Sequence, residues 1–150
     1  MLVYLDMCCL KRPFDDQSQP RIRLESEAVL ALLALQSADV QFVHSPALLL
    51  ENSLNPIAAR ASRVAQWLLA QPPAHTDRQV DTQELEQRTT ELIGMGFKNF
   101  DALHVASAEQ ARADVLATCD DRLLAIAARN RERLKIRVAA VVELAREMIK

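Results

Sequence analysis

Glycine is nearly absent from this chain. Two of the 150 residues are glycine, Gly94 and Gly96, and they lie two positions apart. Glycine supplies many of the positive-φ positions that tight turns between hairpin strands require, so this scarcity disfavours an all-β fold built from hairpins. We therefore expect helices to dominate the structure.

Strand-like and helix-like segments alternate along the chain. Short apolar runs predict strands, and apolar residues spaced by three or four positions predict amphipathic helices. We expect strands at residues 2–5, 40–43, 114–118 and 134–138, and helices at residues 21–36, 46–51, 57–70, 81–94, 101–108, 120–127 and 141–149. This alternation predicts one α/β domain spanning residues 1–150, with a central parallel sheet of about four strands flanked by helices.

Composition narrows the class of protein further. Half of the residues are hydrophobic and a quarter are charged, which is typical of a soluble globular domain. No apolar run reaches the roughly 18 residues of a membrane span. The first apolar run contains an acid and is followed by basic residues, the reverse of the order in a signal peptide. We therefore expect a cytoplasmic protein with no membrane contact.

The three cysteines, Cys8, Cys9 and Cys119, show neither C-x-x-C spacing nor paired histidines. An odd number of cysteines in a cytoplasmic chain argues against a disulfide framework. We expect free thiols that pack as small buried hydrophobes, although a redox or zinc role is an alternative. The chain also lacks a G-x-G-x-x-G or Walker loop, so its sequence offers no nucleotide-binding motif.

Acidic residues follow the predicted strands. Asp6 ends the first strand, Glu51 lies in the helix after the second, and Asp120 follows the third. Asp101 is expected to cap the helix that leads into the third strand. Because ligands of parallel sheets bind outside the carboxyl ends of the strands, we expect these four acids to converge there.

Converging carboxylates repel one another, and a divalent cation would relieve the repulsion. Oxygen ligands favour Mg²⁺ or Mn²⁺, and such a cation can activate water and neutralise charge on a phosphate. Taken singly, Asp101 and Asp120 are better explained as helix caps and Glu51 as a solvated side chain, and the signal is that all four acids converge. Asp6 is harder to explain, since an acid directly after a central strand has few structural roles. His104 is expected to pack on a helix flank, with a phosphate contact as the alternative.

Four segments together resemble the PIN-domain ribonucleases, whose best-known members are toxins of type II toxin–antitoxin pairs. These segments are VYLDMCCLKRPFDD, PALLLENS, FDALHVASA and VLATCDDRLL, and the resemblance covers nearly the whole chain. It implies that Asp6, Glu51, Asp101 and Asp120 bind Mg²⁺ or Mn²⁺ and hydrolyse RNA. It also implies in-line attack by an activated water, which leaves a 3′-hydroxyl and a 5′-phosphate.

The fourth acid is ambiguous because Asp121 follows Asp120 directly. The family's T-x-D segment, with Thr118 as the hydroxyl residue, favours Asp120 as the ligand. The resemblance gives Thr118 the role of orienting a carboxylate or a water at the site. For gripping RNA phosphates beside the acids we select five basic residues, with solvated surface as the default for each: Lys11, Arg12, Arg21, Arg23 and Lys98.

The sequence therefore predicts a metal-dependent endoribonuclease, the toxin of a toxin–antitoxin pair. We expect RNA as the substrate, an antitoxin protein as a partner, and a homodimer. The alternatives are a PIN-fold module that binds RNA or protein without cleavage, and a structural dimer subunit. An intact set of four acids favours the enzyme, since a pure binder has no need to concentrate carboxylates where phosphate must approach.

Overall fold

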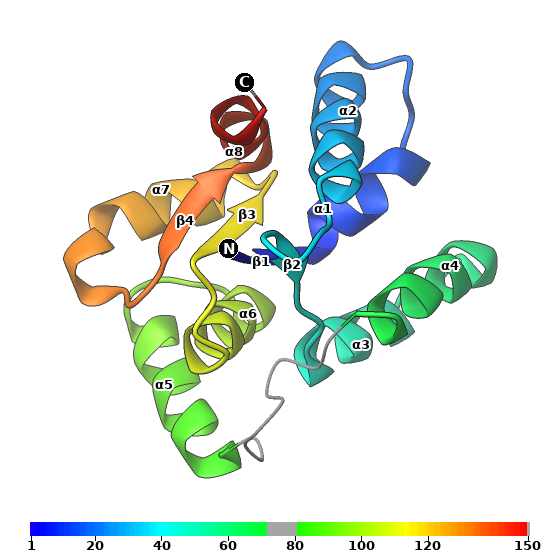
Figure 1. Cartoon of the computed structure of the whole chain (residues 1–150). Helices are drawn as coiled ribbons and strands as arrows, with labels where there is room; N and C mark the ends of the chain where they lie inside the picture. Colours follow the sequence, from blue (N-terminus) through cyan, green and yellow to red (C-terminus); the bar gives the residue numbers. More distant parts are fainter. Residues whose placement is uncertain (72–80, 150) are drawn as a thin grey trace.

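A four-stranded parallel sheet forms the centre of the molecule, described here by a computed structural model for residues 1–71 and 81–149. The strands are β1 (Leu2–Leu5), β2 (Gln41–Phe42), β3 (Val115–Thr118) and β4 (Arg137–Ala140), in the order β2-β1-β3-β4 (Figure 1). Every neighbouring pair of these strands is parallel. The expected fold class is confirmed.

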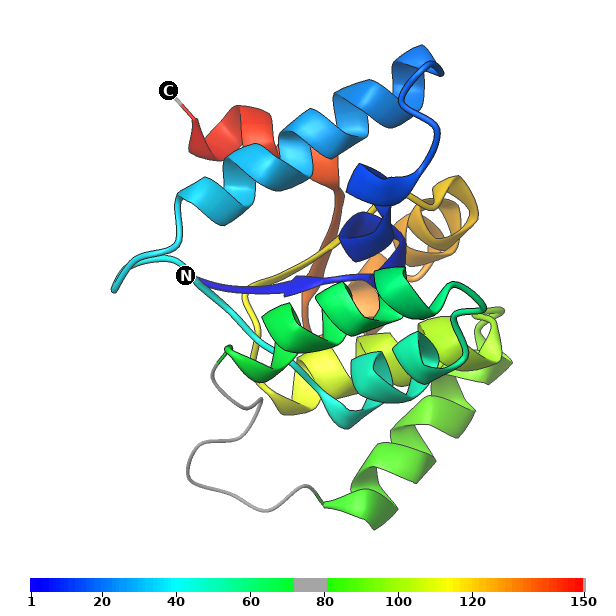
Figure 2. The same cartoon turned by 90° about the vertical axis from the view of Figure 1, so that its right-hand side faces the viewer.

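Helices cover both faces of the sheet. In Figure 2, α2 and α8 lie on one face, and α3, α4, α5 and α6 lie on the other. The short helix α1 and the helix α7 follow the carboxyl ends of β1 and β3. The helices are α1 (Met7–Lys11), α2 (Pro20–Ala34), α3 (Pro46–Ser53), α4 (Ala58–Leu69), α5 (Thr82–Gly94), α6 (Asn99–Gln110), α7 (Asp121–Arg129) and α8 (Val141–Met148), with 3₁₀ turns η1 (Arg12–Phe14) and η2 (Arg131–Arg133).

The core explains why the central strands read as continuous apolar runs. Strand β3 is buried along its whole length, and β1 is buried from Val3 onwards. A strand covered by helices on both faces can bury every side chain, so its sequence does not alternate. The register Leu5↔Ala117 aligns the carboxyl ends of these two strands, and the residues that follow them therefore emerge side by side.

Most helix boundaries agree with the sequence signals to within a few residues. Ser45 caps α3 by accepting a hydrogen bond from the Leu48 backbone N–H at 3.2 Å, with Pro46 in the first turn. Asp81 caps α5 in the same way, accepting from Glu84 N–H at 3.0 Å. The chain leaves α5 through Gly96, whose φ of 111° is a conformation that side chains disfavour.

Three local expectations are wrong. The helix α1 and the turn η1, which follow β1, were not expected at all. The last strand begins at Arg137, three residues later than expected, because the chain bends at residues 135–136 between η2 and β4. Asp101 does not cap α6. The helix begins at Asn99 with Lys98 as the capping residue, so Asp101 lies inside its first turn.

None of the helices in residues 1–71 and 81–149 combines the length and the apolar character needed to cross a membrane.

Candidate metal centre

Asp6 lies at the start of α1, directly after β1, and its side chain is 4% exposed. Its Oδ1 accepts a hydrogen bond from the Met7 backbone N–H at 2.8 Å, and its Oδ2 accepts one from the Thr118 hydroxyl at 2.8 Å. The Cys8 thiol donates to the same Oδ2 at 3.3 Å. Asp6 therefore does have a structural role, as the N-cap of α1, which the sequence did not reveal because α1 was not expected.

Glu51 reaches the same region from α3. Its Oε1 lies 3.0 Å from Nε2 of His104, a fully buried residue of α6. The ligand atoms of Asp6, Glu51 and His104 all lie within 4.8 Å of one another. Residues from three separate elements thus converge at the carboxyl end of the sheet.

A chain of hydrogen bonds fixes the imidazole of His104. Its Nδ1 lies 2.8 Å from the Tyr4 hydroxyl, which lies 2.7 Å from Oγ of Ser45. With a proton on Nε2, His104 donates to Glu51 and accepts from Tyr4. The ring also stacks on Phe100, with centroids 6.2 Å apart. Both ring nitrogens are therefore satisfied inside the protein, and the orientation of Glu51 depends on this buried network.

His104 is the residue at the site that sequence reasoning missed. It was expected to pack on a helix flank. It is indeed buried in α6, but its Nε2 also forms a hydrogen bond with Glu51. The available signal was its position one helical turn after Asp101, on the face of α6 that points to the sheet.

Asp101 is half-buried in the first turn of α6, close to the other acids. Burial, together with the charges of Asp6 and Asp120 and to a lesser extent Glu51, raises the pKa of Asp101 to about 6, while the charge of His104 opposes the rise. Four acids from distant parts of the sequence therefore act on one another electrostatically. Among the described residues, however, Asp101 and Asp120 lie outside the group whose ligand atoms are within 4.8 Å.

The two consecutive acids after β3 differ in their surroundings. Asp120 is the N-cap of α7, and its Oδ1 accepts from the backbone N–H groups of Arg122 and Leu123 at 2.9 and 3.2 Å. Asp121 points to solvent, with a side chain 72% exposed, and forms a two-bond ion pair with Arg21 at 2.8 and 2.7 Å. The charge of Asp120 reaches the acid site, whereas that of Asp121 is neutralised by Arg21.

Thr118 connects two of the acids. Its hydroxyl donates to Asp6, and its Oγ1 accepts from the Asp120 backbone N–H at 3.1 Å. One fully buried side chain therefore fixes both the carboxylate that follows β1 and the backbone that follows β3.

Burial and crowding favour the protonated form of the central groups. Burial, with a smaller contribution from Cys8, raises the pKa of Asp6 to about 8, although His104 and the Thr118 hydroxyl oppose the rise. Burial alone would lower the pKa of His104, but its hydrogen bond to Glu51 and the nearby carboxylates outweigh burial, so this pKa is raised.

The donor set fits a hard divalent cation. Asp6 and Glu51 present carboxylate oxygens, and the nearby Asp101 and Asp120 offer more oxygens of the kind that Mg²⁺ and Mn²⁺ prefer. The raised pKa values of Asp6 and Asp101 reflect the free-energy cost of keeping these buried acids charged without a counter-charge. A bound cation would remove that cost.

The five basic residues selected from the sequence are not equivalent. Arg12 lies 3.2 Å from Asp15 and 3.4 Å from the buried Glu25, and Arg21 is paired with Asp121. Lys11 is half-buried at the end of α1, whereas Arg23 and Lys98 are exposed. Two of the five charges are therefore engaged by carboxylates of the protein itself.

Comparison with protein-family models and with curated protein sequences gives no match. Comparison of the fold with solved structures does. A chain in the crystal structure of FitAcB from Neisseria gonorrhoeae aligns with a TM-score of 0.53 and 16% identity, over 93% of this chain and 97% of that one. A chain of VapBC2 from Rickettsia felis, crystallised bound to a DNA fragment from their promoter, aligns with a TM-score of 0.55 and 15% identity over the same shares. These likenesses show a shared fold and agree with the expected PIN-like architecture.

Proposed function

We propose that this chain is a metal-dependent endoribonuclease of the PIN-domain family and the toxin of a toxin–antitoxin pair. The observation that carries the proposal is the convergence of Asp6 and Glu51, with ligand atoms within 4.8 Å, at the carboxyl edge of a parallel sheet. Carboxylates gathered where an anionic phosphate must approach make sense when a cation binds between them. The fold shared with FitAcB and VapBC2, both toxin–antitoxin complexes, supports the same function.

Asp6 and Glu51 would hold the cation, with Asp101 and Asp120 completing the set of oxygens beside them. A bound Mg²⁺ or Mn²⁺ would supply an activated water and neutralise the charge that builds on the phosphate. Each additional carboxylate adds negative charge to the site, and a bound cation would offset that charge.

The protein's own groups keep these carboxylates in place. The Thr118 hydroxyl and the Met7 N–H fix the two oxygens of Asp6, and His104 fixes Glu51. Because these partners are buried, the carboxylates keep one orientation without reorganising when RNA arrives.

Basic residues near the site would position the RNA backbone. Lys98 precedes Asp101 by three residues at the start of α6, and Lys11 and Arg12 follow Asp6 by one turn or more of α1 and η1. With Arg21 and Arg23 on α2, they form the proposed phosphate-binding surface. We expect Lys11, Arg23 and Lys98 to contribute most, since Arg12 and Arg21 already pair with carboxylates.

The proposal extends to partners. An antitoxin protein would bind the chain, as the toxin role requires. We also propose that the protein is cytoplasmic and forms a homodimer. Two leucines on α2, Leu24 and Leu30, are each 54% exposed and offer apolar surface of the kind that a second subunit covers. Light scattering of the purified protein measures the dimer directly.

Incubation of a mixed RNA pool with the purified protein tests the enzyme. We expect cleavage with Mg²⁺ or Mn²⁺, no cleavage in excess chelator, and products that carry 5′-phosphates. The Asp6→Asn variant, prepared and tested alongside the wild type, should bind RNA without cutting it. Undiminished cleavage in chelator would overturn the metal dependence, and RNA binding without any cleavage by the wild type would identify a binding module instead.

A further inference from the structure

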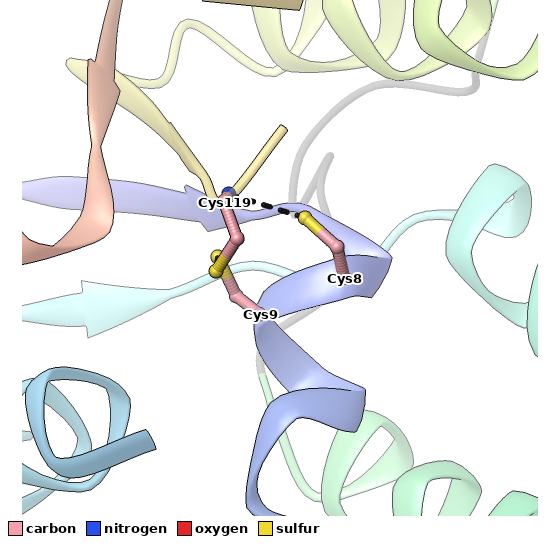
Figure 3. Close-up of side chains that lie close together, drawn as sticks. All are labelled: Cys8, Cys9 and Cys119. Carbon is pink, nitrogen blue, oxygen red and sulfur yellow. Dashed lines mark hydrogen bonds between the residues drawn. The ribbon is translucent and has the colours of Figure 1, made fainter. Parts of the chain in front are cut away.

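Three thiols gather beside the acid site (Figure 3). Cys8 and Cys9 are consecutive residues of α1, and Cys119 directly follows β3. All three are free thiols, and their Sγ atoms lie within 4.8 Å of one another, with Cys9 and Cys119 only 3.6 Å apart. The chain contains no other cysteine. Residues 110 positions apart therefore place all its sulfur nucleophiles at one point.

We propose that Cys8, Cys9 and Cys119 form a binding site for a thiophilic divalent cation of the Zn²⁺ class. A zinc–thiolate bond of about 2.3 Å at tetrahedral angles separates neighbouring sulfurs by roughly 3.7 Å. The Cys9 and Cys119 sulfurs already lie at nearly this separation. The third sulfur, from Cys8, lies within 4.8 Å of both and completes the triangle of ligands.

A disulfide does not explain this arrangement as well. A sulfur–sulfur bond is about 2.0 Å long and joins two thiols, so a Cys9–Cys119 bond would leave Cys8 without a role. Cys8 instead points its sulfur towards the Cys119 backbone, whose N–H donates to it at 3.2 Å (Figure 3). Three converging sulfurs are what a thiolate metal site requires.

The surroundings can accept a metal and its charge. Cys9 and Cys119 are buried, whereas Cys8 is part-exposed and gives an ion access from solvent. Three thiolates around a divalent cation carry a net charge of −1, and the positive charge of Arg12, which acts on Cys119, would partly offset it. A fourth position remains for water or for a nearby oxygen ligand.

The thiol site and the acid site would compete, since they share a contact. The Cys8 sulfur lies 3.3 Å from Oδ2 of Asp6 and 3.3 Å from Oγ1 of Thr118. A cation bound to the thiols would release their protons to solvent, including the Cys8 proton that now forms a hydrogen bond with Asp6, and it would attract the Asp6 carboxylate as a fourth ligand. Occupation of the thiol site would thus withdraw Asp6 from the Mg²⁺ or Mn²⁺ site. This inhibitory consequence rests on the proposed nuclease function, whereas the binding itself does not.

Cobalt(II) alone is the probe for binding. When Co²⁺ is added to the fully reduced protein without oxygen, we expect a sulfur-to-cobalt charge-transfer absorption and protection of all three thiols from a thiol-titrating reagent. The Cys8→Ala variant changes a part-exposed side chain and should fold, yet lose both signals, as should Cys119→Ser. Asp101→Asn is the matched control and should keep both signals. Absence of the charge-transfer band in the wild type, or an undiminished band in Cys8→Ala, would overturn the site.

The regulatory consequence has its own readout. We expect one equivalent of Zn²⁺ to reduce Mn²⁺-dependent RNA cleavage by the wild type, and to reduce that of Cys8→Ala by a smaller fraction. Equal fractional inhibition of the two proteins would overturn the competition. Complete absence of cleavage in every metal, with the cobalt signals present, would contradict the proposed nuclease function and leave the thiol site standing.

Discussion

The acid cluster and the thiol cluster meet at the carboxyl ends of the same two strands, β1 and β3, but they are built differently. The register Leu5↔Ala117 places the residues after β1 beside those after β3. Asp6, Cys8 and Cys9 come from the first end, and Thr118 and Cys119 from the second. Both segments therefore carry oxygen and sulfur side chains, and the contact between Cys8 and Asp6 is where the two clusters meet.

The difference between them lies in what holds the ligands. Each acid at the centre is held by a buried hydrogen-bonding partner, Thr118 for Asp6 and His104 for Glu51. The thiols contact one another, and their other hydrogen bonds are 3.2 to 3.4 Å long, as is usual when one partner is sulfur. Oxygen ligands suit a hard catalytic cation, whereas sulfur ligands suit a thiophilic one. The predictions that follow test this contrast, from the largest expected effect to the smallest.

Removing a central acid should have the largest effect. We expect Asp6→Asn and Glu51→Gln each to reduce cleavage by more than the roughly 10- to 100-fold that loss of an outer partner of a metal ligand costs. Both substitutions keep the shape of the side chain and remove its charge. Steady-state cleavage of a defined RNA at fixed Mn²⁺ measures the effect, and near wild-type rates in either variant would remove that acid from the site.

The consecutive acids after β3 provide a matched pair. Asp120→Asn should lower cleavage at least about 10-fold, because its charge acts on the acid site. Asp121→Asn should change cleavage little, because Asp121 is exposed and pairs with Arg21. The same assay compares the two. A larger loss in Asp121→Asn would reverse the assignment of the fourth acid.

Breaking the network behind Glu51 should destabilise the fold. Tyr4→Phe removes the hydroxyl that lies between Ser45 and His104, and both of these residues are buried. An unsatisfied buried polar group costs about 1–3 kcal/mol, so the free energy of unfolding should fall by that amount. Chemical denaturation measures it. An unchanged free energy of unfolding would contradict a stabilising role for the network behind Glu51. An unchanged kcat would show that cleavage does not require this network to orient Glu51.

The basic surface should give the smallest effect. Replacing Lys11 and Arg23 with serine should reduce the slope of log Kd against log salt by about 0.7 for each phosphate of single-stranded RNA that the protein no longer neutralises. Arg137→Ser is the control, because Arg137 is paired with Glu147 on α8. Binding isotherms in the Asp6→Asn background avoid cleavage. An unchanged slope in the double variant would return Lys11 and Arg23 to ordinary solvated surface.

The fold was largely predictable because its signals are local. Strand β1 is a run of apolar residues that ends at an acid, and α3 and α5 carry recognisable caps at Ser45 and Asp81. The errors occur where a short element or a bend interrupts that local pattern. The five-residue α1 is too short for a hydrophobic period to show, and the bend at residues 135–136 delays the start of the last strand.

The site was predictable only in part because it depends on long-range pairing. Acids at strand ends can be located from sequence, since parallel strands bring those ends together. Side-chain contacts cannot be located in the same way. No spacing within one element predicts the hydrogen bond between His104 and Glu51. The same holds for the approach of Cys119 to Cys8 and Cys9. These contacts appear only when α6 and β3 take their places beside β1.

Crowding at the acid cluster predicts how stability depends on pH without metal. The pKa of Asp6 rises to about 8 and that of Asp101 to about 6 in the folded state, above the ordinary value of 3.8. A raised carboxyl pKa contributes most stability below 3.8 and loses it as pH rises to the folded value. The raised pKa of His104 acts in the same direction, because its stabilisation is complete below its ordinary pKa of 6.5 and is lost as pH rises through the folded value. The metal-free protein should therefore melt at a lower temperature at pH 8 than at pH 5.

Thermal melts of the wild type and Asp6→Asn at pH 8, with and without Mn²⁺, test the cation site most directly. Mn²⁺ at about 100 times its Kd should stabilise the wild type by about 2.7 kcal/mol, a rise of roughly 5 to 11 °C in Tm. Without metal, Asp6→Asn should melt at the same temperature as the wild type or higher, since the substitution removes a buried charge and keeps an oxygen to cap α1. Its response to Mn²⁺ should be much smaller. A lower metal-free Tm in Asp6→Asn, together with no effect of Mn²⁺ on either protein, would contradict the cation site and leave Asp6 as a helix cap alone.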